Sequence, residues 1–160
     1  MKQVKTLSIF MLVALMVAMF VGCSKDDDNS GDVSNLKTYI IGSWHSYKGA
    51  AYFLGGEYSG ESEEVSISKT GEFSEAYYEI KFQDAGHATF GAFQKDENGL
   101  LHWETEDVTY SINGDIVAVR DTEGTTLDLV FNESDKTLCI QVSATANDGT
   151  PTKVSIYLKK

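Results

Sequence analysis

Three histidines are the first side chains to consider for metal binding or acid–base catalysis. His45, His87 and His102 lie far apart in the sequence, and no HxH, HxxxH or CxxC pattern is present. Zinc sites draw their ligands from such spacings, and serine hydrolases carry a Gly-x-Ser-x-Gly turn, which this sequence lacks. The residues therefore nominate no catalytic group and no metal site, and we expect a protein that is not an enzyme and needs no cofactor.

Two acidic clusters, at residues 61–64 and 104–107, are the next candidates. Paired carboxylates hydrolyse glycosides when they are held about 5 to 9 Å apart. Alternation along a strand places Glu104 and Glu106 on one face, where the two charges repel unless water surrounds them, and we interpret this cluster as a wet outer rim. Residues 96–99 lack the ligand spacing and the terminal glutamate of a calcium loop. Neither cluster predicts a catalytic or cation-binding site.

The chain has two cysteines, Cys23 and Cys139. Cys139 stands between Leu138 and Ile140 in a strand-like stretch, which predicts a half-covered thiol with no resolving partner. Cys23 stands where an apolar stretch ends and a charged one begins. We therefore expect no internal disulfide, and the domain must be stabilised by its hydrophobic core.

The sequence before the first cysteine has the three parts of an export signal. Lys2 and Lys5 make the start basic, residues 7–21 are almost entirely apolar, and small Gly22 precedes the cysteine. A membrane-spanning helix needs about 20 apolar residues, so a run of roughly 15 is typical of a cleaved signal. Residues 1–22 are therefore predicted to be a signal peptide.

The end of this signal resembles the lipobox of bacterial lipoproteins, with Phe20 where that pattern most often has leucine. The resemblance implies cleavage before Cys23, a diacylglyceryl thioether on its thiol, and acylation of the new amino group. Two or three acyl chains, at about 0.8 kcal/mol per buried methylene, hold a protein firmly on a bilayer. Cys23 is therefore the predicted lipidation site, and a membrane is the first predicted partner.

The residues after Cys23 indicate where in the cell the protein is located and how it is tethered. Ser24 is not the aspartate that resembles an inner-membrane retention mark, which favours the outer membrane. Residues 24–28 resemble the surface-export signal of lipoproteins in Bacteroidota, and the alternative is a charged spacer that only solvates the tether. Residues 23–34 carry almost nothing apolar, so burial cannot offset the entropy of ordering them, and we expect a flexible acidic tether.

The chain is strongly acidic, with a formal charge of −11. Removal of the signal makes it more negative, because the signal contains two lysines and no acid. Nucleic-acid binding depends on clustered lysine and arginine, so nucleic acid is excluded as a partner. An acidic surface also repels anionic lipid head groups, which leaves the acyl chains to provide membrane attachment.

The spacing of apolar residues predicts the fold of the remainder, residues 35–160. Residues 33–41 have near-helical spacing and predict one short helix that ends at Gly42. Beyond it, apolar and polar residues alternate, with turn pairs such as Asn98-Gly99 and Asp148-Gly149 about every 8 to 12 positions. This pattern predicts an all-β domain of eight or nine antiparallel strands. Closure into an up-and-down β-barrel leaves no exposed strand edge; a two-sheet sandwich is the alternative.

The pair Asn113-Gly114 predicts the register of one hairpin. If the two residues form a type I′ turn, Tyr110 lies opposite Val117. That register puts two independently recognised apolar sets on one face of the ribbon. The shared face contains Val108, Tyr110, Ile112, Val117 and Val119.

The start of this domain resembles that of lipocalins. Residues 39–44 read Tyr-Ile-Ile-Gly-Ser-Trp, a helical lead-in to Gly-x-Trp at the first strand. The layout of signal, acidic tether and glycine-punctuated meander is similar to that of the lipocalin-like domain lipoproteins of Bacteroidota. The resemblance implies a lipocalin-like β-barrel in which Gly42 and Trp44 close the base, with the indole under Lys159 or Lys160. It also implies a module that binds a small apolar ligand.

Aromatic residues provide a candidate contact surface. Tyr47, Tyr52, Phe53 and Tyr58 cluster around the glycine-rich segment 49–60, which we expect to contain a long loop at the barrel mouth. Tyrosines on such a loop contact a sugar or a protein, or else plug the barrel end as core. These four residues are the predicted ligand or partner contacts.

Bulky residues at inward positions bear on the choice between two functions. An eight-stranded barrel encloses a space that side chains just fill or that holds one small ligand. In one hypothesis a residual cavity binds a small apolar molecule, and in the other a solid barrel docks on a protein or glycan at the cell surface. The predicted inward residues favour a filled interior: Tyr78, Phe82, Phe90, Tyr110 and Phe131.

Overall fold

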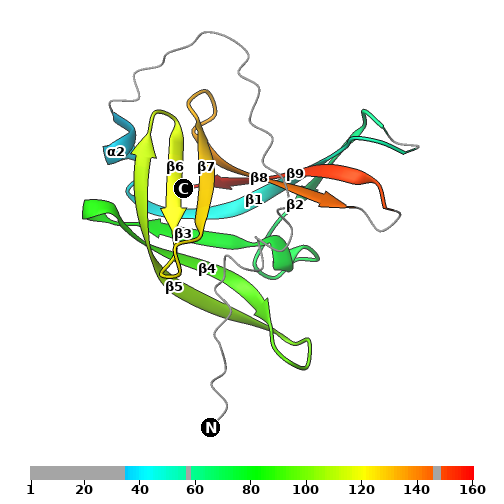
Figure 1. Ribbon diagram of the computed structural model, residues 1–160, viewed down its shortest axis with the longest axis horizontal. Coiled ribbons are helices and arrows are strands. Elements are labelled where there is room, and N and C mark those ends of the chain that lie inside the picture. Colours follow the sequence, from blue (N-terminus) through cyan, green and yellow to red (C-terminus); the bar gives the residue numbers. More distant parts are fainter. Residues whose placement is uncertain (1–34, 57–58, 146–148) are drawn as a thin grey trace.

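The structure is a computed structural model (Figure 1). The parts of the chain that it describes are residues 35–56, 59–145 and 149–160. The predicted signal peptide 1–22, the tether 23–34, the lipidation site Cys23 and the contact residue Tyr58 lie outside the described residues. Within the described part of the chain, no helix has the length and hydropathy needed to cross a membrane.

Most of the regular structure in the described residues is β-strand. One short α-helix is the first element of the described residues, and two 3₁₀ turns, η2 and η3, flank the strand β3. The elements in chain order are α2 (Leu36–Tyr39), β1 (Gly42–Phe53), β2 (Ser62–Ser66), η2 (Ser74–Ala76), β3 (Tyr78–Phe82), η3 (Asp84–Gly86), β4 (His87–Lys95), β5 (Leu101–Asn113), β6 (Ile116–Arg120), β7 (Thr126–Asn132), β8 (Thr137–Thr145) and β9 (Pro151–Lys159).

The strands form one antiparallel sheet that closes on itself. Each strand from β3 to β9 pairs with the next along the chain, and β1 pairs with β3 on one edge and with β9 on the other. The β1–β9 pairing is long, from His45 opposite Lys159 to Phe53 opposite Thr152. The predicted lipocalin-like barrel is therefore confirmed, with eight strands in the closed wall, and the sandwich alternative is wrong because the first and last strands meet.

The one strand outside the closed wall, β2, pairs with β1 and extends the wall at one end. One edge of β1 pairs twice, through residues 42–45 with β3 and through residues 48–52 with β2. On the β9 side, the register shifts between Ser46 and Lys48, and such an irregularity bends a strand. Figure 1 shows β1, β2, β8 and β9 continuing together beyond the barrel body. We call these four strand ends the extension.

A single helical turn precedes the barrel and is shorter than the predicted helix 33–41. Its N-terminus has no side-chain cap. Leu36 and Ile40 are 3% and 0% exposed, so packing against the barrel base, rather than capping, holds the turn in place. Gly42 follows with φ +124, a backbone angle that glycine adopts readily and other residues do not, and the chain turns there into β1.

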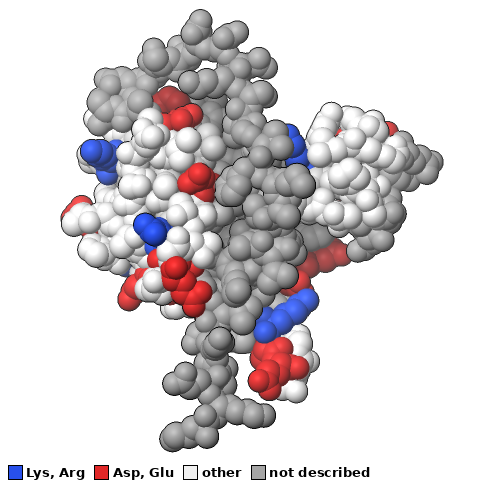
Figure 2. All heavy atoms as spheres, in the orientation of Figure 1, with Lys and Arg blue, Asp and Glu red and all other residues white. Residues whose placement is uncertain are grey.

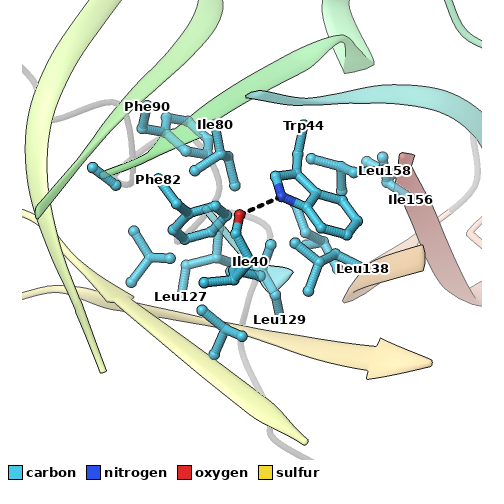
Figure 3. Close-up of a cluster of buried hydrophobic side chains, with 14 of the residues drawn as sticks. Ile40, Trp44, Ile80, Phe82, Phe90, Leu127, Leu129, Leu138, Ile156 and Leu158 are labelled. Carbon is cyan, nitrogen blue, oxygen red and sulfur yellow. Dashed lines mark hydrogen bonds between the residues drawn. The ribbon is translucent and has the colours of Figure 1, made fainter. Parts of the chain in front are cut away.

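Apolar side chains fill the interior of the barrel, which confirms the filled interior predicted from the bulky inward residues. Phe82, Phe90 and Phe131 are buried, and Tyr78 and Tyr110 are half-buried. Figure 3 shows side chains from several strands of the wall pointing toward one another. Burial of each large apolar side chain is worth about 1.5 to 3 kcal/mol. The fully covered ones, at 0 to 1% exposure, are Trp44, Phe82, Phe90, Ile40, Ile80, Leu129, Leu138, Ile140, Leu158, Val117 and Val119.

Trp44 closes the base of this interior. Its Nε1 donates a 2.7 Å hydrogen bond to the carbonyl oxygen of Ile40, which ties β1 to the helical turn (Figure 3). The indole meets the rings of Phe131 and Tyr39 edge-on, with centroids 6.4 and 5.9 Å away. Of the two lysines named from the lipocalin resemblance, Lys160 has its Nζ 5.8 Å from the indole centroid.

The β5–β6 hairpin corrects the predicted register. Its turn is formed by Gly114 and Asp115 rather than by Asn113 and Gly114, and Tyr110 lies opposite Val119. Gly114 has φ +62 and takes the first central position, where type II′ turns require glycine. Because the pairing partner moves by two residues, an even number, each side chain keeps its face. The predicted apolar face is therefore confirmed although the register is wrong.

We expect Trp44→Ala to destabilise the fold severely. The substitution removes a fully buried indole and leaves the carbonyl of Ile40 without its donor, and large-to-small changes of this kind cost about 3 to 5 kcal/mol. Urea denaturation followed by far-UV circular dichroism measures the loss. His45→Ala, at the next and partly exposed position of β1, is the control and should change the free energy of unfolding by less than about 1 kcal/mol. Equal effects at both positions would contradict the assignment of Trp44 to the core.

Candidate functional site

The first part of the glycine-rich segment 49–60, residues 49–53, is strand, and the connection predicted within this segment begins only after Phe53. Strand β1 continues to Phe53, and residues 54–61 connect it to β2. A Cβ at Gly49 would lie 3.1 Å from Ile67 and 3.2 Å from Val65, so glycine here makes room for two apolar side chains. The composition that resembled a loop reflects close packing inside the barrel.

The predicted contact residues of β1 point to both faces of the extension. Tyr52 is 45% exposed, whereas Tyr47 and Phe53 are half-buried. Tyr52 and Phe53 are neighbours in a strand, so their side chains lie on opposite faces. The Nζ of Lys159 lies 4.8 Å from the ring centroid of Tyr47 and covers that ring. These residues do not form one contact surface, and their contact role stays a prediction.

A second lysine lies over a tyrosine on the same outer face. The Nζ of Lys48 lies 4.7 Å from the ring centroid of Tyr157 and 3.2 Å from Oε1 of Glu64. The hydrogen bond to Glu64 raises the pKa of Lys48 above its usual value. On the face shown in Figure 2, acidic and basic side chains are likewise interspersed among uncharged areas. The outer face of the extension thus combines paired charges and rings covered by lysines with the exposed ring of Tyr52.

The carboxylates Glu104 and Glu106 correct the prediction of an outer rim. They share one face, as predicted, but they pair with Ala92 and Phe90, whose side chains are buried inside the barrel. They therefore lie on the inner face of β5, where both are half-buried. Glu104 accepts a 2.7 Å contact from His102 Nε2, which raises the pKa of that imidazole. Among the described residues, no three side chains of His, Cys, Asp or Glu gather in a metal-binding group.

Asp96 uses its carboxylate to form a turn. Its Oδ1 accepts backbone N–H groups from Asn98 and Leu100, each at 2.8 Å. These bonds, that from Leu100 foremost, lower the pKa of Asp96. The acidic segment at residues 96–99 thus closes the β4–β5 hairpin.

Cys139 is more covered than the half-covered thiol that the alternation predicted. Its side chain lies on the outer face of β8 and the residue is 8% exposed. Its register partners are Val130 of β7 and Tyr157 of β9. A buried thiol in such surroundings is a small apolar side chain rather than a nucleophile.

The recess that gathers polar and aromatic groups lies on the outside of the barrel wall. It is a partly open hollow of about 240 Å³ over β1, β3, β4 and β5. Its walls combine hydroxyl, amide and charged groups with one indole and one glycine. The lining residues are Ser43, Glu79, Ile80, Lys81, Gln83, Thr89, Gly91, Trp103 and Thr105.

Trp103 forms the aromatic wall of this hollow and is fixed on several sides. Its six-membered ring lies against the backbone of Gly91, where a Cβ would come within 2.3 Å of Cζ2. Phe93 meets the indole edge-on, with 5.1 Å between centroids, and Tyr77 lies at a tilt, with 5.8 Å between centroids. The Nζ of Lys69 lies 3.9 Å from the centroid of the indole and covers one face of it. The indole is held in one orientation at the protein surface.

A small polar network stands beside the indole. The hydroxyl of Tyr77 donates a 2.7 Å hydrogen bond to Oε1 of Glu79, and Lys69 Nζ lies 3.6 Å from the same oxygen. Burial, together with the bond to Glu79, raises the pKa of Tyr77 to about 12. Glu79 thus fixes the tyrosine and the lysine that pack against Trp103.

Sequence reasoning missed this hollow, although one signal for it was present. Inward Phe90 and Ala92 on β4 place Gly91 and Phe93 on the outer face by simple alternation. Trp103 is the register partner of Phe93, so two large aromatic residues share an outward position beside a glycine. An outward aromatic pair next to a glycine departs from the apolar-in, polar-out rule and marks a packed surface feature.

A family model described as a lipocalin-like domain matches residues 26–138. The match covers most of the chain, and the structure has the closed antiparallel barrel that a lipocalin-like domain implies. The chain therefore belongs to the lipocalin-like domain family. A search of curated proteins found no match.

Several solved structures are similar at low identity. Apocrustacyanin C2 is 15% identical with a TM-score of 0.37, over 79% of this chain and 63% of that one. Lobster apocrustacyanin A1 is 14% identical with a TM-score of 0.36, over 79% of this chain and 67% of that one. A redesigned β-barrel is 12% identical with a TM-score of 0.34, over 78% and 95%. The chain spans about three fifths of the apocrustacyanin C2 chain.

We expect Tyr77 to titrate later than an ordinary tyrosine and to couple stability to alkaline pH. The unfolded chain loses this proton near the ordinary value of 10.0, whereas the folded chain keeps it until about pH 12. The stabilisation is therefore complete below pH 10 and is lost as the pH rises from 10 to 12. Tyrosine absorbance at 295 nm during alkaline titration should lose its latest component in Tyr77→Phe.

Glu79→Gln tests the cause of that shift. The variant removes the charged acceptor, so the pKa of Tyr77 should fall toward its ordinary value. Glu64→Gln, which removes a distant carboxylate bonded to Lys48, is the matched control and should leave the titration unchanged. An unaltered late component in Glu79→Gln would show that Glu79 does not bind the phenol.

Proposed function

We propose that this chain is an outer-membrane lipoprotein, of the kind found in Bacteroidota, whose barrel binds glycans on its outer wall as an accessory module. The anchor is proposed at Cys23, on the strength of the basic start, the short apolar run and the small residue before the cysteine. The acidic residues that follow support display at the cell surface. Membership of the lipocalin-like domain family supports a binding role rather than catalysis.

The filled interior is the observation that carries this proposal. The side chains that occupy the base of the barrel, where a lipocalin-type ligand would lie deepest, are fully covered, including Trp44, Phe90 and Leu129. Ordered protein interiors are close-packed, so these positions leave no room for a bound molecule. The recess with convergent polar and aromatic groups is instead on the outside, at Trp103.

The exposed apolar residues favour a glycan over a protein partner. A protein interface has a contiguous apolar core within a polar rim. Here, in the described part of the chain, the large exposed apolar side chains belong to different elements and connections, and single exposed residues of this kind form no core. They are Tyr39, Tyr52, Leu54, Phe73, Leu100 and Ile116. Sugars, by contrast, need only a local aromatic wall among hydroxyl and amide groups.

A small apolar ligand is the second candidate function. The observation that favours it is the inner face of the extension, where Val65, Val142 and Val154 stay half-buried. These valines lie above the closed core and would line the entrance to a lipocalin-type site. An apolar molecule bound there would contact the extension rather than the base.

Substitution of Cys23 tests the anchor. In cells fed a labelled fatty acid, the wild-type chain should incorporate label and fractionate with the outer membrane. Cys23→Ala should lose all label and enter the soluble fraction, because the acyl chains alone provide attachment. Cys139→Ala is the matched control and should behave as wild type. Label retained by Cys23→Ala would refute the proposed lipidation site.

Two binding measurements separate the candidate functions. Phosphatidylcholine vesicles carrying the acylated protein should be retained on insoluble neutral polysaccharides, and empty vesicles should pass. The Cys23→Ala chain in water should show no saturable binding of cis-parinaric acid by fluorescence. Saturable uptake of that probe at one site, with no retention on any polysaccharide, would replace the glycan proposal by the apolar-ligand candidate.

A further inference from the structure

We propose that the hollow beside Trp103 binds a single uncharged sugar ring. This inference rests on the proposed glycan-binding function and adds the location and the ligand class. It concerns the outer wall of β3, β4 and β5, away from the barrel interior where the family resemblance places a ligand. The size, the lining and the rigidity of the hollow each support it.

The size of the hollow suits one ring. It measures about 240 Å³ and is partly open to solvent. Sites for drug-sized ligands usually span about 300 to 1,000 Å³. The hollow is thus too small for a long-chain lipid or a polycyclic cofactor, and a hexose ring with its hydroxyls is of the right order.

The polar lining suits a hydroxyl-rich ligand. Each sugar hydroxyl both donates and accepts a hydrogen bond, so the best lining mixes both kinds of group. Here Glu79 accepts, Lys81 donates and Gln83 does both, and the neighbouring strands β4 and β5 add the hydroxyls of Thr89 and Thr105. Hydrogen bonds to charged groups are the stronger ones, which favours Glu79 and Lys81 as the anchoring contacts.

The charges in the lining favour an uncharged ligand. Glu79 and Lys81 lie two residues apart on β3, so both side chains point to the outer face. Among the lining side chains the one negative and the one positive group cancel. Just outside the lining, Lys69 pairs with Glu79 and Asp107 accepts a hydrogen bond from Thr89, which adds one further charge of each sign. An acidic sugar would meet the carboxylate of Glu79, and an amino sugar would meet the ammonium of Lys81, so either charge costs binding energy.

Trp103 provides the apolar wall and needs no rearrangement to do so. The C–H groups on one side of a sugar ring are apolar and bury well against an aromatic surface. Lys69 covers one face of the indole, Phe93 meets it edge-on, and its six-membered ring lies close to the backbone of Gly91, so the part of the indole that lines the hollow is held in place. A preformed wall spares the cost of ordering a side chain on binding. Gly91 is therefore a positioning residue, since any larger side chain displaces the indole.

The experiment uses the acylated protein in phosphatidylcholine nanodiscs and the methyl glycosides of glucose, galactose, mannose and N-acetylglucosamine as probes. Isothermal titration and tryptophan fluorescence follow binding, and Trp44 serves as an internal reference because it is fully buried. At least one glycoside should bind saturably, with a dissociation constant on the order of 1 mM. Glucuronate and glucosamine should bind at least several-fold more weakly.

Three variants locate the site. Trp103→Leu should weaken binding by about tenfold or more, through loss of the aromatic wall. Thr105→Val should weaken it by about fivefold, through loss of one hydroxyl. Thr109→Val is the matched control, the same change on the same outer face of β5 but beyond the hollow, and should bind as wild type. If Trp103→Leu does not fold, the Thr105→Val and Thr109→Val pair decides the result.

The outcomes distinguish this inference from the proposed function. Equal binding by wild type, Trp103→Leu and Thr105→Val would overturn the site, as would tighter binding of glucuronate or glucosamine than of every neutral glycoside. If Trp103→Leu vesicles are still retained on polysaccharide, the hollow is not the site while the glycan-binding function stands. If wild-type vesicles are not retained on any polysaccharide and no glycoside binds, both proposals fail together.

Discussion

The pairing of the first strand with the last is the interaction on which the rest of this structure depends. Strand β1 hydrogen-bonds to β9 from His45 to Phe53, and its other edge is occupied by β3 and then β2. Closure pairs the edges of β1 and β9 that would otherwise invite association, and it brings the inward faces of all eight wall strands around one axis. Trp44 stands where β1 leaves the base, so the indole that seals the core belongs to the strand that closes the wall.

Closure around large side chains determines where a ligand can bind. Two glycines each leave room for neighbouring side chains, one on the inner face of the wall and one on the outer face. Gly49 faces inward and makes room for Val65 and Ile67, which adds to the filled interior. Gly91 faces outward and lets the six-membered ring of Trp103 come close to the wall, which creates a rigid aromatic surface outside. The barrel thus combines a packed inside with a structured outside, and the proposed glycan site follows from that arrangement.

The sequence predicted the fold well because side-chain alternation reports directly on which face of a strand is buried. The inward sets around Phe82, Phe90 and Val119 follow from a period of two and need no knowledge of strand partners. The β5–β6 register failed because Asn113-Gly114-Asp115 allows two turns that differ by one residue and preserve the same face. The loop predicted within residues 49–60 begins later than the glycines suggested, because a glycine needed for packing, such as Gly49, cannot be told from a glycine needed for a turn by sequence alone.

The candidate site was beyond sequence reasoning for a different reason. Trp103 and Glu79 come together only through the order β3–β4–β5 and the register that sets Phe93 opposite Trp103. Glu104 was assigned to the outside because alternation gives two faces without saying which one the barrel encloses. The buried partners Ala92 and Phe90 settle that choice, and they are pairing partners rather than sequence neighbours.

Hydrogen exchange of backbone amides, measured residue by residue by NMR, tests the central claim most directly. If β1 and β9 close the barrel around a filled core, the paired amides of residues 45–53 and 152–159 should exchange only through global unfolding. Their free energies of exchange should then agree within about 1 kcal/mol with those of β6 and β7. Exchange of the β1 and β9 amides through a local opening of much lower free energy, while β6 and β7 stay protected, would contradict the closed barrel.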